Sequence, residues 1–415
     1  MVHDSRRSRG VRLGLAREPL AAAASMGVGL DLAERRALHA LGPAVFGLDD
    51  RALLGVARRR GGDGDTAAHR AAAAGLFEHR EQVLDMTAQV LAAVDAPPAL
   101  RALFALALRD NEMWARMAPC LPAIDFPAAC CVELGASLAE ARPLSVAGLL
   151  YYMGISLIDD VIDDDRAGAW AEVPGEQVTL AGLCLTSHVP VGALTRLWAL
   201  APADARMAPY HALFLRASYE MSVGQYLDVR GEVDAGGDPM ALSRRIVALK
   251  TGSTGAFLAE LAATHLGAAA GAYEALGTLC KYLYMSMQVA SDIHDIWGKP
   301  VSPDLANGVM TLPIVFALHS LPRGERAALQ RRLASGDRSE AGQAYMRDRV
   351  TAAGGLAYAL LEAEALRQRA LLAWASGAGA LPGQAGFGYL LEAARVAPAL
   401  YRSRSAPGQD SDAGA

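Results

Sequence analysis

The chain has 415 residues, of which 53% are hydrophobic and 20% are charged, so it can bury a large core. Its net charge of −5 at pH 7 and its scattered arginines exclude the basic surface that nucleic-acid binding needs. The five cysteines are an odd number without a CxxC pair. They argue against a disulfide framework or a zinc site and predict a cytoplasmic protein.

The first 66 residues are predicted to form an N-terminal extension that is partly disordered. The extension begins with an Arg- and Ser-rich stretch and ends in a charged Gly/Asp loop, residues 57–66. From residue 67 to residue 402, long Ala- and Leu-rich segments repeat apolar residues at spacings of three and four, which predicts helices. We therefore expect one all-α domain, built as a helical bundle, and a disordered polar tail at 403–415. No uncharged apolar run is long enough to predict a membrane span.

Residues 143–168 (PLSVAGLLYYMGISLIDDVIDDDRAG) are predicted to form a helix that opens at Pro143 and ends in a cluster of aspartates. On such a helix Asp159 and Asp163 lie one turn apart on one face, with Asp160 beside them. Because like charges at this spacing repel, we expect a cation to compensate them. Carboxylates without a nearby His or Cys suit Mg²⁺ held together with substrate phosphates. A solvent-exposed acidic helix end is the alternative for this stretch alone.

A second acidic stretch follows at residues 288–313 (QVASDIHDIWGKPVSPDLANGVMTLP). Helical spacing places five polar side chains of this stretch on one stripe: Gln288, Ser291, Asp292, Asp295 and Lys299. His294 falls off the stripe and is expected on the surface. The alternative to a second metal-binding motif is an ordinary polar helix face.

These motifs resemble those of the trans-isoprenyl diphosphate synthases, the polyprenyl synthetase family. The resemblance rests on DDVIDD, then QxxSDxxD, GKP, SPDL and NGxxTLP in this order, and covers about residues 80 to 400. Lys250-Thr251 resembles the KT motif of the family, and Gly224-Gln225 resembles its GQ helix. The resemblance implies the isoprenoid-synthase helical bundle with a central cavity, and we expect a homodimer.

In that family the two acidic motifs face each other and hold an allylic prenyl diphosphate through Mg²⁺ ions, three in the usual picture. Asp159, Asp160, Asp163, Asp292 and Asp295 match the catalytic acids. Ser291 stands where the family has an aspartate. The resemblance implies the metal ligands Asp159, Asp160, Asp163, Asp164, Ser291, Asp292 and Asp295. It implies the phosphate- and substrate-binding residues Arg166, Gln225, Lys250, Thr251, Gln288 and Lys299.

The length of the prenyl tail is expected to depend on the helix before the first motif. Gly154 lies nearest the aspartates, and Tyr151 follows a turn deeper, where it could form the floor of the tail pocket. At a helical rise of about 1.5 Å per residue, this geometry favours a tail of roughly 15 to 20 carbons. The alternative is that Gly154 serves close helix packing.

The family's site for a second substrate, isopentenyl diphosphate, has no counterpart in this sequence. No GKxxR occurs anywhere, the family's RRG has become Arg166-Ala167-Gly168, and Val309 replaces the lysine of NGKxT. Charge-assisted contacts are the basis of diphosphate recognition. The residues therefore favour a class I terpene synthase that ionises the allylic diphosphate without isopentenyl diphosphate. Two alternatives stay open: a prenyltransferase, elongating or acting on another acceptor such as an aromatic ring, and a non-catalytic partner subunit of a prenyl synthase.

Overall fold

The computed structural model describes residues 66–377, with gaps at 118–119, 164–165, 202–203, 231–237 and 300. Almost all of the predicted extension, the predicted tail and residues 378–402 lie outside the described part. Every regular element within that part is a helix, which confirms the all-α prediction. In chain order the elements are α4 (Thr66–Ala92), α5 (Pro98–Met117), α6 (Pro122–Glu133), α7 (Leu138–Ile162), η1 (Gly168–Glu172), α8 (Gly175–Thr186), α9 (His188–Leu197), α10 (Met207–Arg230), α11 (Pro239–Val247), η2 (Ala248–Gly252), α12 (Ser253–His265), α13 (Ala270–Trp297), α14 (Pro303–Asn307), α15 (Leu312–Ser320), α16 (Arg323–Ala334), α17 (Glu340–Ala352) and α18 (Gly355–Gly377).

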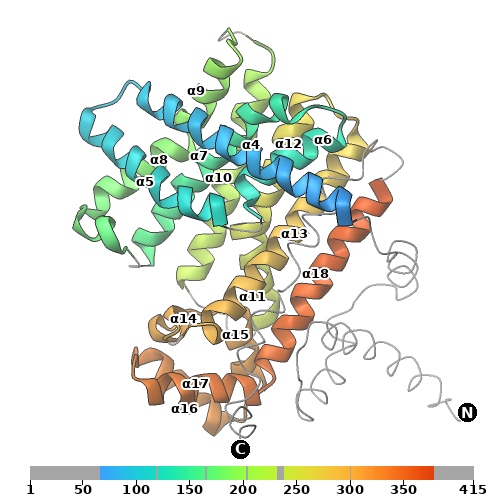
Figure 1. Cartoon of the computed structure of the whole chain (residues 1–415). Helices are drawn as coiled ribbons and strands as arrows, with labels where there is room; N and C mark the ends of the chain where they lie inside the picture. Colours follow the sequence, from blue (N-terminus) through green and yellow to red (C-terminus); the bar gives the residue numbers. More distant parts are fainter. Residues whose placement is uncertain are drawn as a thin grey trace, which may run out of the picture.

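The helices form a bundle around α7 and α13. α7 contacts α4, α6, α8 and α9, and α13 runs along α12 and α18. Figure 1 shows α13 and α18 side by side, with the short helices α14 to α17 gathered at one end of the bundle. The aspartates of both acidic stretches lie at the C-terminal ends of α7 and α13. Both ends lie next to α14.

The central helix α7 begins earlier than Pro143, where the sequence placed its start. Ser137 and Glu140 form a capping box, in which the Glu140 backbone N–H donates to Ser137 Oγ and the Ser137 N–H donates to Glu140 Oε2. The helix therefore starts at Leu138 and has Pro143 in its interior. The cap determined the start, and the proline is tolerated at the cost of one helical hydrogen bond.

Gly154 serves helix packing, which corrects its predicted role in the tail pocket. A Cβ at Gly154 would lie 2.7 Å from the carbonyl oxygen of Gly182 and 2.8 Å from the backbone nitrogen of Thr186, both on α8. Gly148, further along α7, approaches the backbone of Ala123 on α6 in the same way. Both glycines face neighbouring helices, and only the absence of a side chain permits these contacts.

The change Gly154→Ala is expected to lower the free energy of unfolding by about 1–3 kcal/mol, the usual cost of overpacking. The added methyl group meets the backbone of α8, which cannot turn aside as a side chain would. Gly192→Ala is the matched control, since that glycine also lies within a helix but has open space around its Cβ position. Urea unfolding of both variants checks this, and equal stability changes would contradict the packing role.

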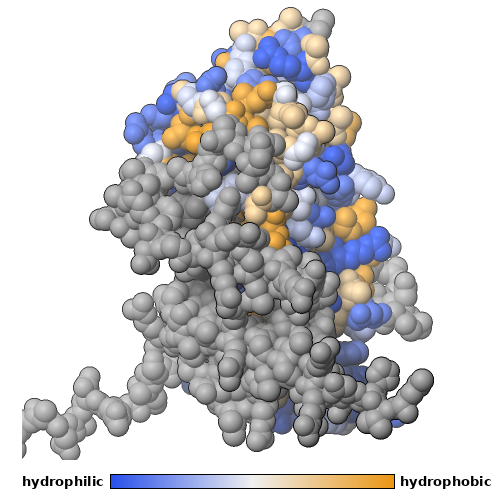
Figure 2. Space-filling model, turned by 90° about the vertical axis from the view of Figure 1, so that its right-hand side faces the viewer, coloured by the Kyte–Doolittle hydropathy of each residue, from blue (hydrophilic) through white to orange (hydrophobic). Residues whose placement is uncertain are grey.

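Within the described residues, two helical regions are long and apolar enough to cross a membrane, Leu138–Ile162 and Gly175–Leu197. In both regions, 56% of the most apolar 18-residue window is buried inside the protein. α7, which forms the first region, is surrounded by α4, α6, α8 and α9, as expected for a core helix. Figure 2 shows hydrophilic and hydrophobic residues interspersed over the described part of the face that it draws. All five cysteines lie in described segments and are free thiols.

Candidate active site

A cleft of about 200 Å³ lies where the ends of α7 and α13 meet α10, η2 and α14. It brings together the two acidic motifs, which are more than a hundred residues apart in the sequence. Six aspartates line it: Asp159 and Asp163 from the end of α7, Asp292 and Asp295 from α13, Asp228 from α10, and Asp304 from α14. Such a concentration of carboxylates is unfavourable unless cations compensate it.

Lys250 supplies one compensating charge. Its Nζ lies 3.0 Å from Asp159 Oδ1 and 3.0 Å from Asp228 Oδ2, so it joins the first motif to α10. Burial opposes the ammonium form, but the attraction of Asp159 and Asp228 outweighs it and raises the lysine pKa above its ordinary value. Lys250 is thus held as a cation at the centre of the cleft.

The backbone around Lys250 explains how it reaches this place. Lys250 lies in η2, a single π-helical turn between α11 and α12. A Cβ at Gly224 would come within 2.6 Å of the Lys250 backbone nitrogen, so only glycine lets α10 approach η2 so closely. The Gly-Gln and Lys-Thr motifs of the sequence therefore pack against each other.

A chain of polar contacts orients the second motif. Thr251 Oγ1 donates to Gln288 Oε1 at 3.2 Å, and Gln288 Nε2 donates to Asp292 Oδ1 at 2.9 Å. Burial raises the pKa of Asp292 to about 7; the Gln288 hydrogen bond opposes this rise, and the nearby Asp295 and Asp228 add to it. Across the cleft, Gln225 Nε2 donates to Asp163 Oδ1 at 3.3 Å.

Two cleft residues were missed as site residues in the sequence, Asp228 and Asp304. Asp228 lies three residues after Gln225, one helical turn further along the same helix, and that spacing could have identified it. Asp304 is the acid of SPDL and begins the short helix α14. Burial and the charges of Asp292 and Asp295 raise its pKa to about 8.

Seven of the predicted site residues line the cleft: Asp159, Asp163, Lys250, Thr251, Gln288, Asp292 and Asp295. Lys299 is not part of the lining but pairs with Asp295, which is. Asp160, on the same helix turn as Asp159, is half-buried and is not part of the lining. Asp164 lies outside the described residues.

Ser291 and Arg166 do not line the cleft. Ser291 is exposed, so the structure gives no support to Ser291 as a metal ligand. Arg166, in the loop after α7, donates from Nη1 to the carbonyl oxygen of Val173 at 2.6 Å, which holds it against the segment between η1 and α8.

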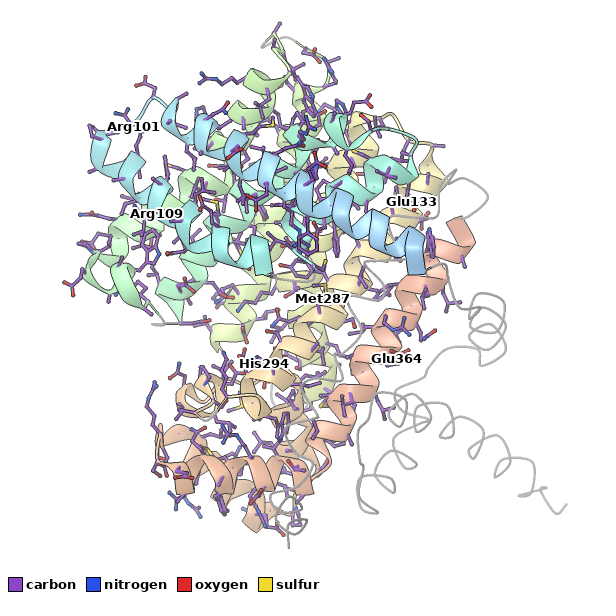
Figure 3. The ribbon with its side chains drawn as sticks, in the orientation of Figure 1. Arg101, Arg109, Glu133, Met287, His294 and Glu364 are labelled. Atoms are coloured by element: carbon purple, nitrogen blue, oxygen red, sulfur yellow. The ribbon has the colours of Figure 1, made fainter. Side chains whose placement is uncertain are left out.

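Tyr151 is fully buried in the core and does not line the cleft. Its ring packs at 5.8 Å from that of Phe214 and at 4.8 Å from that of Phe257, measured between centroids. His294 is exposed on α13, as expected, and Figure 3 shows it further toward the end of that helix than Met287.

The cleft residues suit a hard divalent cation. Oxygen donors dominate the described lining, which contains no His or Cys. Burial first, and then neighbouring carboxylates, raise the pKa values of Asp292 and Asp304. Among the described residues, no three Asp, Glu, His or Cys side chains already converge as a metal cluster. The carboxylates alone therefore do not form a closed cage, which leaves room for ligands from a bound substrate.

Comparisons with known proteins agree with this architecture. A sequence model of the polyprenyl synthetase family matches residues 127–348. The structure is similar to that of geranylgeranyl pyrophosphate synthetase from Pyrococcus horikoshii Ot3, with a TM-score of 0.61, 19% identity, and coverage of 78% of this chain and 97% of that one. It is also similar to a decaprenyl diphosphate synthase from Rhodobacter capsulatus, with a TM-score of 0.62, 16% identity, and coverage of 81% and 99%.

A third similar structure is the polyprenyl synthase from Caulobacter crescentus CB15 complexed with calcium and isoprenyl diphosphate. Its TM-score is 0.60 at 20% identity, with 84% of this chain and 96% of that one covered. No curated protein sequence matches the chain. At these identities the structures establish the fold, and the family model covers more than half of the sequence. The chain belongs to the polyprenyl synthetase family.

Proposed function

We propose that this protein ionises an allylic prenyl diphosphate with divalent metal ions, Mg²⁺ in the first place, and transfers the prenyl group to an acceptor. The observation that carries the proposal is the cleft in which two acidic motifs and Lys250 converge. Prenyl transfer comes first because the family model and the similar structures are those of prenyl synthases. The Caulobacter structure, with calcium and isoprenyl diphosphate, supports this substrate class.

The residues divide the work by charge. Lys250 would bind the diphosphate through a charge-assisted hydrogen bond and exchange one of its carboxylate partners for a phosphate oxygen. Asp159, Asp163, Asp292 and Asp295 would hold the metal ions, with Asp228 and Asp304 adding negative charge nearby. When bound, the ions neutralise the charge that develops on the departing diphosphate. The number of ions, three in the resembled enzymes, belongs to this proposal.

The Thr251–Gln288–Asp292 chain would position the second motif before substrate arrives. Asp292 is 6% exposed, and its carboxylate accepts a hydrogen bond from the Gln288 side-chain amide, so the Asp292 rotamer is restricted. Preorganised groups cost little reorganisation when the bond breaks, which is how they favour the transition state. Gln225 would do the same for Asp163.

Isopentenyl diphosphate is not the acceptor that these residues favour. Val309, in place of the family's lysine, lines the cleft with an apolar side chain. The region that aligns with the family's GGKxxRP motif has neither its lysine nor its arginine, and it forms the start of α6, where Asp125 is fully buried. Asp125 accepts from Arg80 Nε at 2.9 Å and from the Leu121 N–H at 2.7 Å, so Arg80 is engaged inside the core. Arg80 is therefore not available to bind a second diphosphate.

We expect that labelled isopentenyl diphosphate is not consumed when the protein turns over farnesyl or geranylgeranyl diphosphate. The reason is the loss of the basic contacts that a second diphosphate requires. Thin-layer or mass-spectrometric analysis of the products checks this. Label in a longer prenyl diphosphate would instead make the protein a chain-elongating synthase.

A terpene synthase is the second candidate, and the same apolar Val309 favours it, because a cation formed without isopentenyl diphosphate can cyclise and lose a proton. Mass spectrometry of the products, with and without added aromatic acceptors, separates cyclisation from transfer.

A non-catalytic partner subunit would release no diphosphate in the presence of Mg²⁺. Gly154 packs against α8 and Tyr151 lies in the core, so neither residue lines the cleft. Turnover of geranyl, farnesyl and geranylgeranyl diphosphate in the same assay tests the predicted tail of roughly 15 to 20 carbons.

We also propose a homodimer that forms through α10. Four large apolar side chains are exposed along this helix: Leu215, Tyr219, Tyr226 and Val229. Such a patch is costly in water and suits a second copy of the chain. The double change Leu215→Glu and Tyr219→Glu is expected to halve the mass measured by light scattering. A monomeric wild-type protein would contradict the dimer.

A further inference from the structure

A second cavity, of about 290 Å³, lies between α11, α15 and α16, next to the acidic cleft. The two spaces share wall residues, Asp228 and Ser243 among them. The helices meet at the end of the bundle where α14 to α17 gather (Figure 1). Apart from the shared Asp228, no residue with a role in the proposed reaction lines this cavity.

The walls are mostly apolar. Leu242 and Ile246 of α11 face Val315 and Leu318 of α15 across the cavity. Small-molecule sites have this character, an apolar body with a few polar groups that fix orientation, and this volume lies at the lower end of their range. A small ligand with a hydrocarbon chain would therefore fit better than a polar one.

One polar group on the walls is buried without a partner. Arg326 donates from Nη2 to the carbonyl oxygens of His319 and Leu321, but its Nε has no hydrogen-bond partner. Leaving a buried donor unpaired costs stability, so a ligand that pairs this Nε would bind favourably. Ser243, which is 6% exposed, adds a hydroxyl to the same walls.

The charges decide how a ligand would lie. Asp228, at the wall shared with the acidic cleft, repels an anion, whereas the guanidinium of Arg326 attracts one. Arginine presents its donors in a planar fork that suits carboxylate and phosphate groups. We propose that this cavity is a second binding site, for a small amphipathic anion whose acid group binds Arg326 and whose hydrocarbon chain lies along α11 and α15.

Calorimetric titration of the full-length protein tests the site, without metal ions or prenyl diphosphate, so that the outcome is independent of the proposed reaction. The probes are decanoate, decyl phosphate and 1-decanol, which share a chain and differ in the head group. Both anions are expected to bind, and the alcohol to bind at least about tenfold more weakly. Preference for one anion identifies a carboxylate or a phosphate ligand.

Variants connect that binding to the cavity. Arg326→Gln is expected to weaken decanoate binding by about tenfold, whereas Arg323→Gln, an exposed arginine on the same helix, leaves it unchanged. Val315→Phe fills the apolar part and should weaken all three probes. If Arg326→Gln melts at too low a temperature for titration, decanoate binding is measured with Val315→Phe and with Arg326→Lys, which keeps the charge. Absence of binding to the wild type, equal binding of the alcohol, or wild-type affinity in Val315→Phe would overturn the proposal.

Discussion

Replacing Asp292 by alanine is expected to reduce the rate of diphosphate release by about 10²- to 10³-fold, the usual effect of removing one group that stabilises a developing charge. Asp292 is the most deeply buried acid of the cleft and is oriented by Gln288. Asp159→Ala should have a similar effect from the opposite side. Release of inorganic pyrophosphate from farnesyl diphosphate at saturating Mg²⁺ measures both, and removal of the metal by a chelator should abolish it.

The stability of these variants separates a lost function from a lost fold. Burial, and then the nearby Asp295 and Asp228, raise the pKa of Asp292 and so destabilise its ionised form. The metal-free Asp292→Ala variant should therefore melt no lower than the wild type at pH 8. Asp85→Ala, an exposed aspartate on α4, is the control and should change neither activity nor stability. Near wild-type turnover in Asp292→Ala would show that the cleft is not where diphosphate departs.

Replacing Lys250 by methionine is the second change with a large expected effect. The substitution keeps most of the side-chain volume but removes the ammonium group, so the allylic substrate loses a charge-assisted contact and kcat/KM should fall by about 10²-fold. It also leaves Asp159 and Asp228 unpaired beside each other. The melting temperature should therefore fall, and added Mg²⁺ should restore part of it.

A double-mutant cycle tests that reasoning. Asp228→Asn removes one of the two carboxylates that Lys250 pairs with, so it should cost stability alone but recover stability in the Lys250→Met background. Urea unfolding of the four proteins gives the coupling energy. Additive effects of the two changes would mean that the ion pair contributes nothing measurable, as is common for pairs nearer to solvent.

Part of the site follows directly from the spacing of residues along two helices. The pairs Asp159 and Asp163, and Asp292 and Asp295, each lie at spacings of three or four, so any helix presents each pair on one side. The same periodicity does not place Ser291 in the cleft lining. Ser291 is one residue from Asp292, a rotation of about 100°, and that rotation turns it out to solvent.

The all-α class, the family and the order of the two motifs can be read from the sequence, because apolar periodicity and short polar spacings are local properties of the chain. Which acids share one cleft depends on how the helices pack. Asp228 joins them because Gly224 lets α10 approach η2, and Asp304 joins them because α14 folds back against α13. The sequence around Gly154 is compatible with a glycine that lines a pocket and with a glycine at a helix contact. In the structure α8 lies opposite Gly154, so the glycine is at a helix contact. The local sequence cannot predict this, because it does not say which helix packs there.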